Sequence, residues 1–261
     1  MELVDTHCHL FLPPLWQDLE GVLARARDVG VGQIVVPAYD VASWDLLDDL
    51  RGRAGVHLAF GLHPWVAGED LDLAVLRRAL IDSQAVAVGE VGLDFAIPDA
   101  DRARQLSVLR SQLDLARELD LPVLLHCRGA FEELITLLTS HTPHLRGVLH
   151  AFSRSPQLAQ RFVDLGLHIA FGGAVTRPRA ERARASAAAV DARHLLLETD
   201  APSIGLDGVP PAQTEPCHVA AVARCLAELR GDSVEEIARV TTENAFHLFG
   251  IGPRPAVGRP R

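Results

Sequence analysis

Short apolar runs alternate with amphipathic segments along most of the chain. Eight of these runs have the length and composition of buried strands, and they lie at residues 3–8, 33–37, 56–61, 85–89, 122–126, 147–150, 167–171 and 194–199. The segments between them carry apolar residues at helical spacing, at residues 15–29, 71–81, 100–119, 131–138, 156–165 and 179–189. Strands that alternate with helices predict βαβ units and a parallel sheet.

The number of strands favours closure of this sheet into a (β/α)8 TIM barrel, with a doubly wound open sheet as the alternative. The chain has 261 residues, which is close to the roughly 250 residues of one such barrel. Two more helices are predicted at residues 217–230 and 233–248, and Ser233 with Glu236 forms a capping box at the start of the second. We therefore expect one barrel domain over residues 1–250 and a disordered tail over residues 251–261, which is rich in Pro, Gly and Arg.

Histidine and acidic side chains stand where the apolar runs end, far apart in the sequence. They are His7, His9, His63, Glu90, His126, His150 and Asp200. In a (β/α)8 barrel the carboxyl ends of all the strands meet on one face, and active sites lie there. The pattern therefore predicts a metal site at this mouth of the barrel.

The spacing of these candidates indicates how they could divide between two metal positions. His7 and His9 are two residues apart on the first strand, so both side chains point to the same side. Asp200 ends the eighth strand, which neighbours the first strand in a closed barrel. His126 and His150 end two adjacent strands and favour a second metal position.

Glu90 and three other polar residues have further predicted parts in this site. A carboxylate that follows an apolar run is costly to bury unless it is paired or metal-bound, so Glu90 could bridge two ions through its two oxygens. Asp5 and Glu198 share the strand faces of the metal candidates and could orient them from behind. His63 ends the third strand, where it could hold a substrate phosphate or assist proton transfer; a purely structural role is the alternative.

Composition removes several other kinds of chemistry. All 25 basic residues are arginine, so a lysine Schiff base and a carboxylated lysine bridge are both excluded. The net charge of −9 argues against broad nucleic-acid binding through a basic face, but not against a nuclease whose few arginines and metals contact phosphates locally. Four cysteines without a CxxC pair indicate reduced, apolar filler residues. Because we find no signal peptide and no run long enough to span a membrane, we expect a cytoplasmic protein. No strong apolar stripe marks an oligomer interface, so we expect a monomer.

Seven short motifs together resemble the TatD family of metal-dependent hydrolases, which belongs to the amidohydrolase-like barrels. They are Asp5-Thr6-His7-Cys8-His9, Gly61-Leu62-His63-Pro64, Gly89-Glu90-Val91-Gly92-Leu93-Asp94, Pro122-Val123-Leu124-Leu125-His126-Cys127-Arg128, His150-Ala151-Phe152, Glu198-Thr199-Asp200-Ala201-Pro202 and Thr242-Glu243-Asn244-Ala245-Phe246. Each motif alone is weak evidence, but the ordered set extends from residue 5 to about residue 249.

The resemblance implies a dinuclear centre that holds two divalent ions, which could be Zn, Mn or Mg. The two ligand sets would be His7, His9, Glu90 and Asp200 for one ion, and Glu90, His126 and His150 for the other. His63 and Arg128 would lie near the substrate phosphate. The residues with catalytic roles would be Asp200, Glu90 and His63.

Members of this family are known as 3′→5′ exonucleases on DNA or RNA, and a D-aminoacyl-tRNA deacylase activity is also attributed to the group. We therefore expect a phosphodiesterase with a nucleic-acid substrate. Two metals would activate water, Asp200 would accept its proton, and Arg128 would neutralise charge on the phosphate. Hydrolysis of an ester or amide bond at the same centre is the first alternative, and a non-catalytic binding barrel is the second.

Three positions depart from the family pattern. Phe95 stands where a tyrosine is usual, Ala151 where a cysteine is usual, and Gln213-Thr214 where Arg-Asn often precedes Glu-Pro. None of these changes removes a metal candidate. Aromatic residues make up only 5% of the chain, and the candidate stacking platforms near the mouth are Phe152, Phe171, Trp65 and Phe95.

Overall fold

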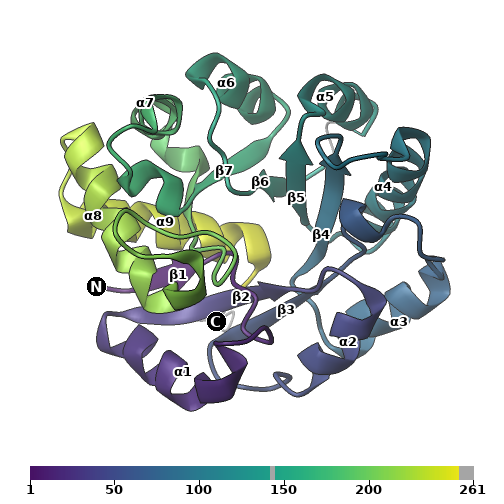
Figure 1. Ribbon diagram of the computed structural model, residues 1–261, viewed down its shortest axis with the longest axis horizontal. Helices are drawn as coiled ribbons and strands as arrows, with labels where there is room; N and C mark the ends of the chain where they lie inside the picture. The colour runs from purple at the N-terminus through teal and green to yellow at the C-terminus, as the bar shows by residue number, and fades with distance from the viewer. Residues whose placement is uncertain (142–144, 253–261) are drawn as a thin grey trace, which may run out of the picture.

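The computed structural model, which describes residues 1–141 and 145–252, is a barrel of eight parallel strands surrounded by helices (Figure 1). Each strand pairs with the next one along the chain, in the order β1 to β8. The strands are β1 (Leu3–Asp5), β2 (Val31–Pro37), β3 (Val56–Phe60), β4 (Ala87–Asp94), β5 (Val123–Arg128), β6 (Gly147–Leu149), β7 (Leu167–Phe171) and β8 (Leu195–Leu197). The expected (β/α)8 class is therefore confirmed, and the doubly wound sheet was the wrong alternative.

The barrel closes where the first and last strands meet. The backbone N–H of Thr6 donates to the carbonyl of Leu197 at 3.0 Å, and that of Asp200 donates to the carbonyl of His7 at 2.8 Å. The N–H of His9 donates to the carbonyl of Ala201, also at 2.8 Å. Because these bonds run just beyond the ends of β1 and β8, they bring the Asp-Thr-His-Cys-His and Glu-Thr-Asp motifs side by side.

The helices lie mostly around the outside of the strands (Figure 1). They are α1 (Leu19–Asp28), α2 (Val41–Asp48), α3 (Leu73–Asp82), α4 (Arg102–Glu118), α5 (Phe131–Thr139), α6 (Pro156–Asp164), α7 (Glu181–Ala189), α8 (Val219–Arg230) and α9 (Val234–Phe249). All eight predicted helices are present. Helix α2 was not predicted; it is only eight residues long and starts at a reciprocal cap between Asp40 and Ser43. At the start of α9 only half of the predicted capping box forms, because Ser233 accepts from the N–H of Glu236 without a returning bond.

Two layers of apolar side chains hold this architecture. Most of the core lies between the strands and the helices. A second cluster fills the inside of the barrel with one residue from each strand: Val4, Val35, Ala59, Ala87, Leu124, Val148, Ala170 and Leu196. Helix α9 covers this cluster with Leu248 and Phe249, and Ile251 joins them. Ile251, the first residue of the tail that was predicted to be disordered, is thus buried. Residues 253–261 of that tail lie outside the described residues.

Helix α9 closes the amino-terminal end of the barrel. Asn244 donates to the carbonyls of Ala192 and Leu195 at the start of β8, and Thr242 donates to the carbonyl of Glu2 before β1. Only the carboxyl ends of the strands are therefore left to form a functional site. The four cysteines are free, as expected. In the described part of the chain, no helix combines the length and hydropathy needed to cross a membrane.

Candidate metal centre

A cavity of about 630 Å³ lies at the carboxyl end of the strands. Seven of the eight residues that the sequence predicts for the site line it: His9, His63, Glu90, His126, Arg128, His150 and Asp200. The eighth, His7, is fully buried beside them, with its Nε2 atom 3.3 Å from Nε2 of His9. The structure thus brings all the predicted site residues together, while their roles as metal ligands remain a prediction.

Glu90, in the middle of β4, stands between two pairs of histidines. Its Oε2 atom lies 3.2 Å from Nε2 of His7 and 3.7 Å from Nε2 of His9. Its Oε1 atom lies 3.1 Å from Nδ1 of His126 and 2.9 Å from Nε2 of His150. Oε2 therefore faces one pair of imidazole nitrogens, and Oε1 faces a second pair besides the imidazole of His63. One carboxylate in such a position can bridge two ions.

Asp200 adds a second carboxylate to one of these pairs. Its Oδ1 atom lies 3.4 Å from Nε2 of His9 and 3.9 Å from Nε2 of His7. The backbone of Asp200 has φ of +52°, in the left-handed region that residues other than glycine rarely occupy. Such a conformation persists only where surrounding contacts enforce it, and here the bond from the N–H of Asp200 to the carbonyl of His7 contributes to that.

The outer partners of two histidines favour a lone pair directed toward Glu90. Nδ1 of His9 lies 3.1 Å from the carbonyl oxygen of Pro37, so Nδ1 carries the proton and Nε2 is free to bind a metal. Nε2 of His126 has no hydrogen-bond partner among the described residues, but it lies 3.4 Å from Oδ2 of Asp94. The carboxylate favours a proton on this nitrogen, and in the neutral ring Nδ1 is then free. The donor set of imidazoles and carboxylates fits a divalent metal, and these outer contacts favour the tautomers that metal binding needs.

His63 differs from the other histidines of the site. Its Nδ1 atom accepts a hydrogen bond from the N–H of Trp65 at 3.1 Å, so in the neutral ring Nε2 carries the proton. This Nε2 lies 3.3 Å from Oε1 of Glu90, where it can donate. The distances alone would allow His63, Glu90 and His126 to hold one metal. The tautomer instead favours the predicted part in substrate binding or proton transfer.

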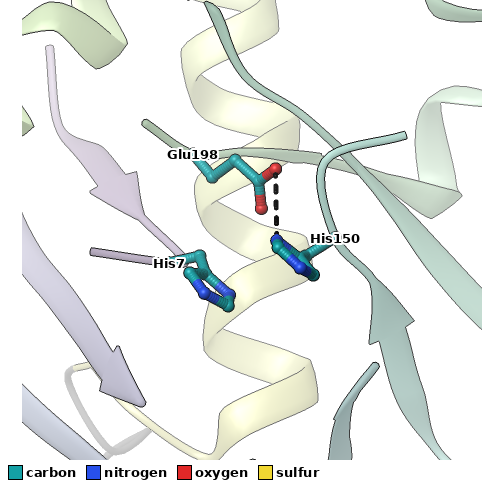
Figure 2. A group of neighbouring side chains, drawn as sticks. All are labelled: His7, His150 and Glu198. Atoms are coloured by element: carbon teal, nitrogen blue, oxygen red, sulfur yellow. Dashed lines mark ion pairs between the residues drawn. The ribbon is translucent and has the colours of Figure 1, made fainter. Parts of the chain in front are cut away.

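His7, His150 and Glu198 lie close together in the buried part of the centre (Figure 2). The rings of His7 and His150 stack with their centroids 4.1 Å apart. Glu198, just after β8, extends toward both rings, with its Oε1 atom 4.0 Å from Nδ1 of His150 (Figure 2). Among the described residues, Nδ1 of His7, Nδ1 of His150 and Oε2 of Glu198 have no hydrogen-bond partner. Glu198 is thus placed to orient a histidine from each pair.

Asp5 ties the two strands of this corner together. Its carboxylate accepts from the N–H and the hydroxyl of Thr199, at 2.9 and 2.6 Å, and from the N–H of His7 at 3.3 Å. Burial raises the pKa of Asp5 to about 7. Asp5 therefore fixes the backbone around His7 rather than contacting an imidazole nitrogen.

Burial and charge act in opposite directions on the titrating groups of the centre. Burial would raise the pKa of Glu90, but the surrounding imidazoles hold it well below its usual range. Burial would also lower the pKa of His150, but the nearby carboxylates, Glu90 first, raise it to about 10. Burial lowers the pKa of His7 to about 4 and raises that of Glu198 to about 8. Protons therefore occupy part of the nitrogen set at neutral pH, and a metal that binds there must release them.

Two of the four aromatic residues predicted near the mouth line the cavity, and two do not. Trp65 and Phe152 line the cavity as expected, and the indole N–H of Trp65 donates to Asp94 at 2.8 Å. Phe171 was a wrong candidate, because it is fully buried in the outer core. Phe95 is also absent from the lining and packs under the guanidinium of Arg102.

Tyr39, Phe131 and Arg154 line the cavity but were not identified from the sequence. Each stands within a few residues of the end of β2, β5 or β6, which is the only signal that could have indicated them.

Comparison with known proteins identifies relatives over almost the whole chain. A family model described as TatD related DNase matches residues 4–250. The uncharacterized metal-dependent hydrolase YjjV of Escherichia coli (strain K12) is 40% identical over 253 residues, covering 95% of this chain and 98% of that one. The deoxyribonuclease TATDN3 of Homo sapiens is 32% identical over 263 residues, covering 95% and 94%. The crystal structure of YjjV superimposes with a TM-score of 0.90 over 96% of this chain and 98% of that one, at 39% identity.

Proposed function

The chain belongs to the TatD family of metal-dependent hydrolases, enzymes that act on ester bonds, and on this premise we propose that it is a two-metal phosphodiesterase that shortens DNA or RNA from the 3′ end. The observation that carries the proposal is the position of Glu90. Its two oxygens lie 2.9–3.7 Å from two separate pairs of imidazole nitrogens. One carboxylate between two nitrogen pairs supports two ions rather than one.

The two proposed ion positions have distinct ligands. His7, His9 and Asp200 would hold one ion with Oε2 of Glu90, and His126 and His150 would hold the other with Oε1. When bound, such ions supply Lewis acidity to phosphate oxygens and lower the pKa of water. Mixed nitrogen and oxygen ligands are compatible with Zn, Mn or Mg.

The residues of the chain supply the rest of the proposed mechanism. Asp200 has a pKa below its ordinary value, because His9 and the other nearby imidazoles outweigh the effect of burial. It is therefore ionised at neutral pH and can accept a proton from the attacking water. His63 presents its Nε2 proton to the cavity side of Glu90 and can donate to a phosphate oxygen or to the leaving group.

Recognition of a nucleic acid has support from the wall of the cavity and from the relatives. The exposed guanidinium of Arg128 can neutralise a phosphate. Trp65 is 61% exposed and its indole is fixed by Asp94, so it offers a rigid stacking surface for a base. A human relative is named a deoxyribonuclease. Since the family is one of enzymes, the non-catalytic barrel considered from the sequence is not retained.

The test is cleavage of a single-stranded DNA oligonucleotide labelled at its 5′ end. The purified protein is stripped of metal and then given Mg²⁺, Mn²⁺ or Zn²⁺, with EDTA as the control. We expect a ladder that shortens from the 3′ end and that EDTA abolishes. If metal-loaded protein leaves the oligonucleotide intact but hydrolyses an ester or amide such as D-aminoacyl-tRNA, the phosphodiesterase proposal is wrong and the alternative replaces it.

A further inference from the structure

The charged groups that line the cavity fall into two classes. Its acids, Glu90 and Asp200, are buried and face the histidines. Its two arginines, Arg128 and Arg154, are exposed. Over residues 1–141 and 145–252, neither guanidinium forms a hydrogen bond or an ion pair with a protein group. The rim therefore carries two free positive charges on a chain whose net charge is −9, and this arrangement suits an anion from outside.

Arg154 is held in place without using its hydrogen-bond donors. Its guanidinium carbon lies 5.3 Å from the centre of the Phe131 ring, a cation–π contact. Phe131, at the start of α5, packs edge-on against Phe162 with ring centroids 6.4 Å apart. The backbone carbonyl of Arg154 accepts from the hydroxyl of Ser186 at 2.6 Å. The guanidinium is thus oriented by an aromatic face, while its N–H fork stays free for a phosphate.

Arg128 approaches the same part of the rim from β5. It stands two residues after His126, and its carbonyl accepts from the N–H of Phe95 at 2.8 Å. Phe131, which supports Arg154, follows it by three residues. Arg128 and Arg154 therefore flank the start of α5, next to the side of the centre formed by His126.

Resting on the proposed function, we propose that Arg154 holds the phosphate adjacent to the scissile one, in a second phosphate subsite beside Arg128. A cavity of about 630 Å³ falls within the range of pockets that enclose ligands larger than one phosphate group. The substrate class is then a nucleic-acid end with at least two consecutive phosphates, rather than a phosphodiester with one.

The experiment compares two dinucleotide substrates that differ by one phosphate. Thymidylyl-thymidine has only the scissile phosphate, and its 5′-phosphorylated form has the adjacent phosphate too. The ratio of their kcat/KM values is measured for the metal-loaded wild type, Arg154→Ala and Arg78→Ala. Arg78 is a matched control, because it is exposed on α3, is absent from the cavity lining, and has no ion pair among the described residues.

We expect the wild type to prefer the two-phosphate substrate about tenfold or more, as one charge-assisted contact with an arginine would produce. Arg154→Ala should bring the ratio close to one, and Arg78→Ala should leave it unchanged. Because the ratio is internal to each enzyme, partial loss of folding or metal does not alter it. A wild type without preference, or an Arg154→Ala variant that keeps it, would overturn the subsite.

Failure of the proposed function gives a different result. The wild type would then cleave neither dinucleotide, and binding of the same two compounds is measured by calorimetry instead. Tighter binding of the two-phosphate compound by the wild type, lost in Arg154→Ala, would support the subsite for an anionic substrate of another class. Equal binding of both compounds by the wild type would overturn it.

Discussion

At the scale of single residues, neighbours outside the centre favour one free nitrogen on three of its histidines. His9 donates a hydrogen bond from Nδ1 to a backbone carbonyl, and Nε2 of His126 faces the carboxylate of Asp94. His63 instead accepts a hydrogen bond at Nδ1 from a backbone N–H. These partners come from other strands and loops. The sequence could therefore predict that the histidines gather at one mouth, but not which of them presents a lone pair and which a proton.

The residues that sequence reasoning missed have no chemical signature of their own. Arg154 and Tyr39 are single residues in loops, and they become site candidates only because the folded barrel places them at the cavity. Phe171 was misplaced for a related reason. It ends a strand as the metal candidates do, but its side chain points into the layer between the strands and the helices. A shift of one residue along a strand exchanges one face for the other.

Glu198 should strengthen metal binding through the histidines beside it. In Glu198→Gln the amide retains one acceptor oxygen, for the N–H of Ala151 that now bonds Oε1 at 2.5 Å. The other carboxylate oxygen, Oε2, has no hydrogen-bond partner among the described residues and becomes an NH₂ group, which cannot accept from an imidazole nitrogen. Loss of an outer carboxylate typically weakens metal binding about 10–100-fold, and we expect a decrease in this range.

The measurement is competition between the protein and a chelator of known affinity for Zn²⁺ or Mn²⁺. Glu228→Gln, at an exposed position of α8, is the matched control and should retain wild-type affinity. Unchanged affinity in Glu198→Gln, with circular dichroism like that of the wild type, would show that Glu198 does not position the histidines.

At the scale of elements, the eight strands were predictable because each is a short and almost continuous apolar run. Strands buried on both faces have that composition in a parallel sheet. The main errors are at the ends: β4 extends to Asp94, and β1 ends at Asp5, before His7 and His9. Helix α2 was not predicted, because eight residues are too few for a helical pattern of apolar positions to stand out. Its start is determined by the local cap between Asp40 and Ser43.

Helix α9 should contribute to the stability of the fold through the hydrogen bonds of Asn244. The side chain of Asn244 donates to two carbonyls, at 2.8 and 2.9 Å, that lie before and at the start of β8. Asn244→Ala leaves both acceptors without this partner, which costs about 1–3 kcal/mol and should lower Tm by roughly 2–10 °C in a chain of this size. Metal affinity should stay unchanged, because the helix lies at the opposite end of the barrel.

Thermal unfolding of metal-loaded protein checks this, with Glu243→Ala as the control. Glu243 forms only an exposed ion pair with Arg239, which is worth about 0.3–0.5 kcal/mol. Equal Tm values for Asn244→Ala and Glu243→Ala would contradict the part given to α9 in closing the barrel.

At the scale of the whole molecule, assembly of the barrel concentrates charge in one buried centre, and this makes stability depend on pH. In the metal-free protein the pKa of His150 rises from its ordinary 6.5 to about 10, so its stabilising effect is complete below pH 6.5 and is lost as the pH rises toward 10. The pKa of Glu198 rises to about 8, so its ionisation also opposes folding as the pH increases to that value.

Metal-free protein should therefore lose several degrees of Tm between pH 7 and pH 10. The lowered pKa of His7, about 4, acts only below its ordinary value of 6.5 and does not oppose this trend. Metal-loaded protein should show a smaller change, because ions replace protons on the nitrogens. Scans of EDTA-treated and reloaded samples test this, and a Tm that rises with pH in the metal-free sample would be the contrary result.

In the proposed mechanism, Glu90 joins two metal positions into one phosphodiesterase centre. The most direct test is calorimetric titration of the metal-free protein with Mn²⁺ or Zn²⁺, with cleavage of labelled single-stranded DNA measured at each ratio, for the wild type and Glu90→Gln. We predict two equivalents bound by the wild type, full activity only after the second, and loss of at least one equivalent in Glu90→Gln. Saturation of binding and activity by one equivalent, or two equivalents with full activity in Glu90→Gln, would show that Glu90 does not join two metal positions.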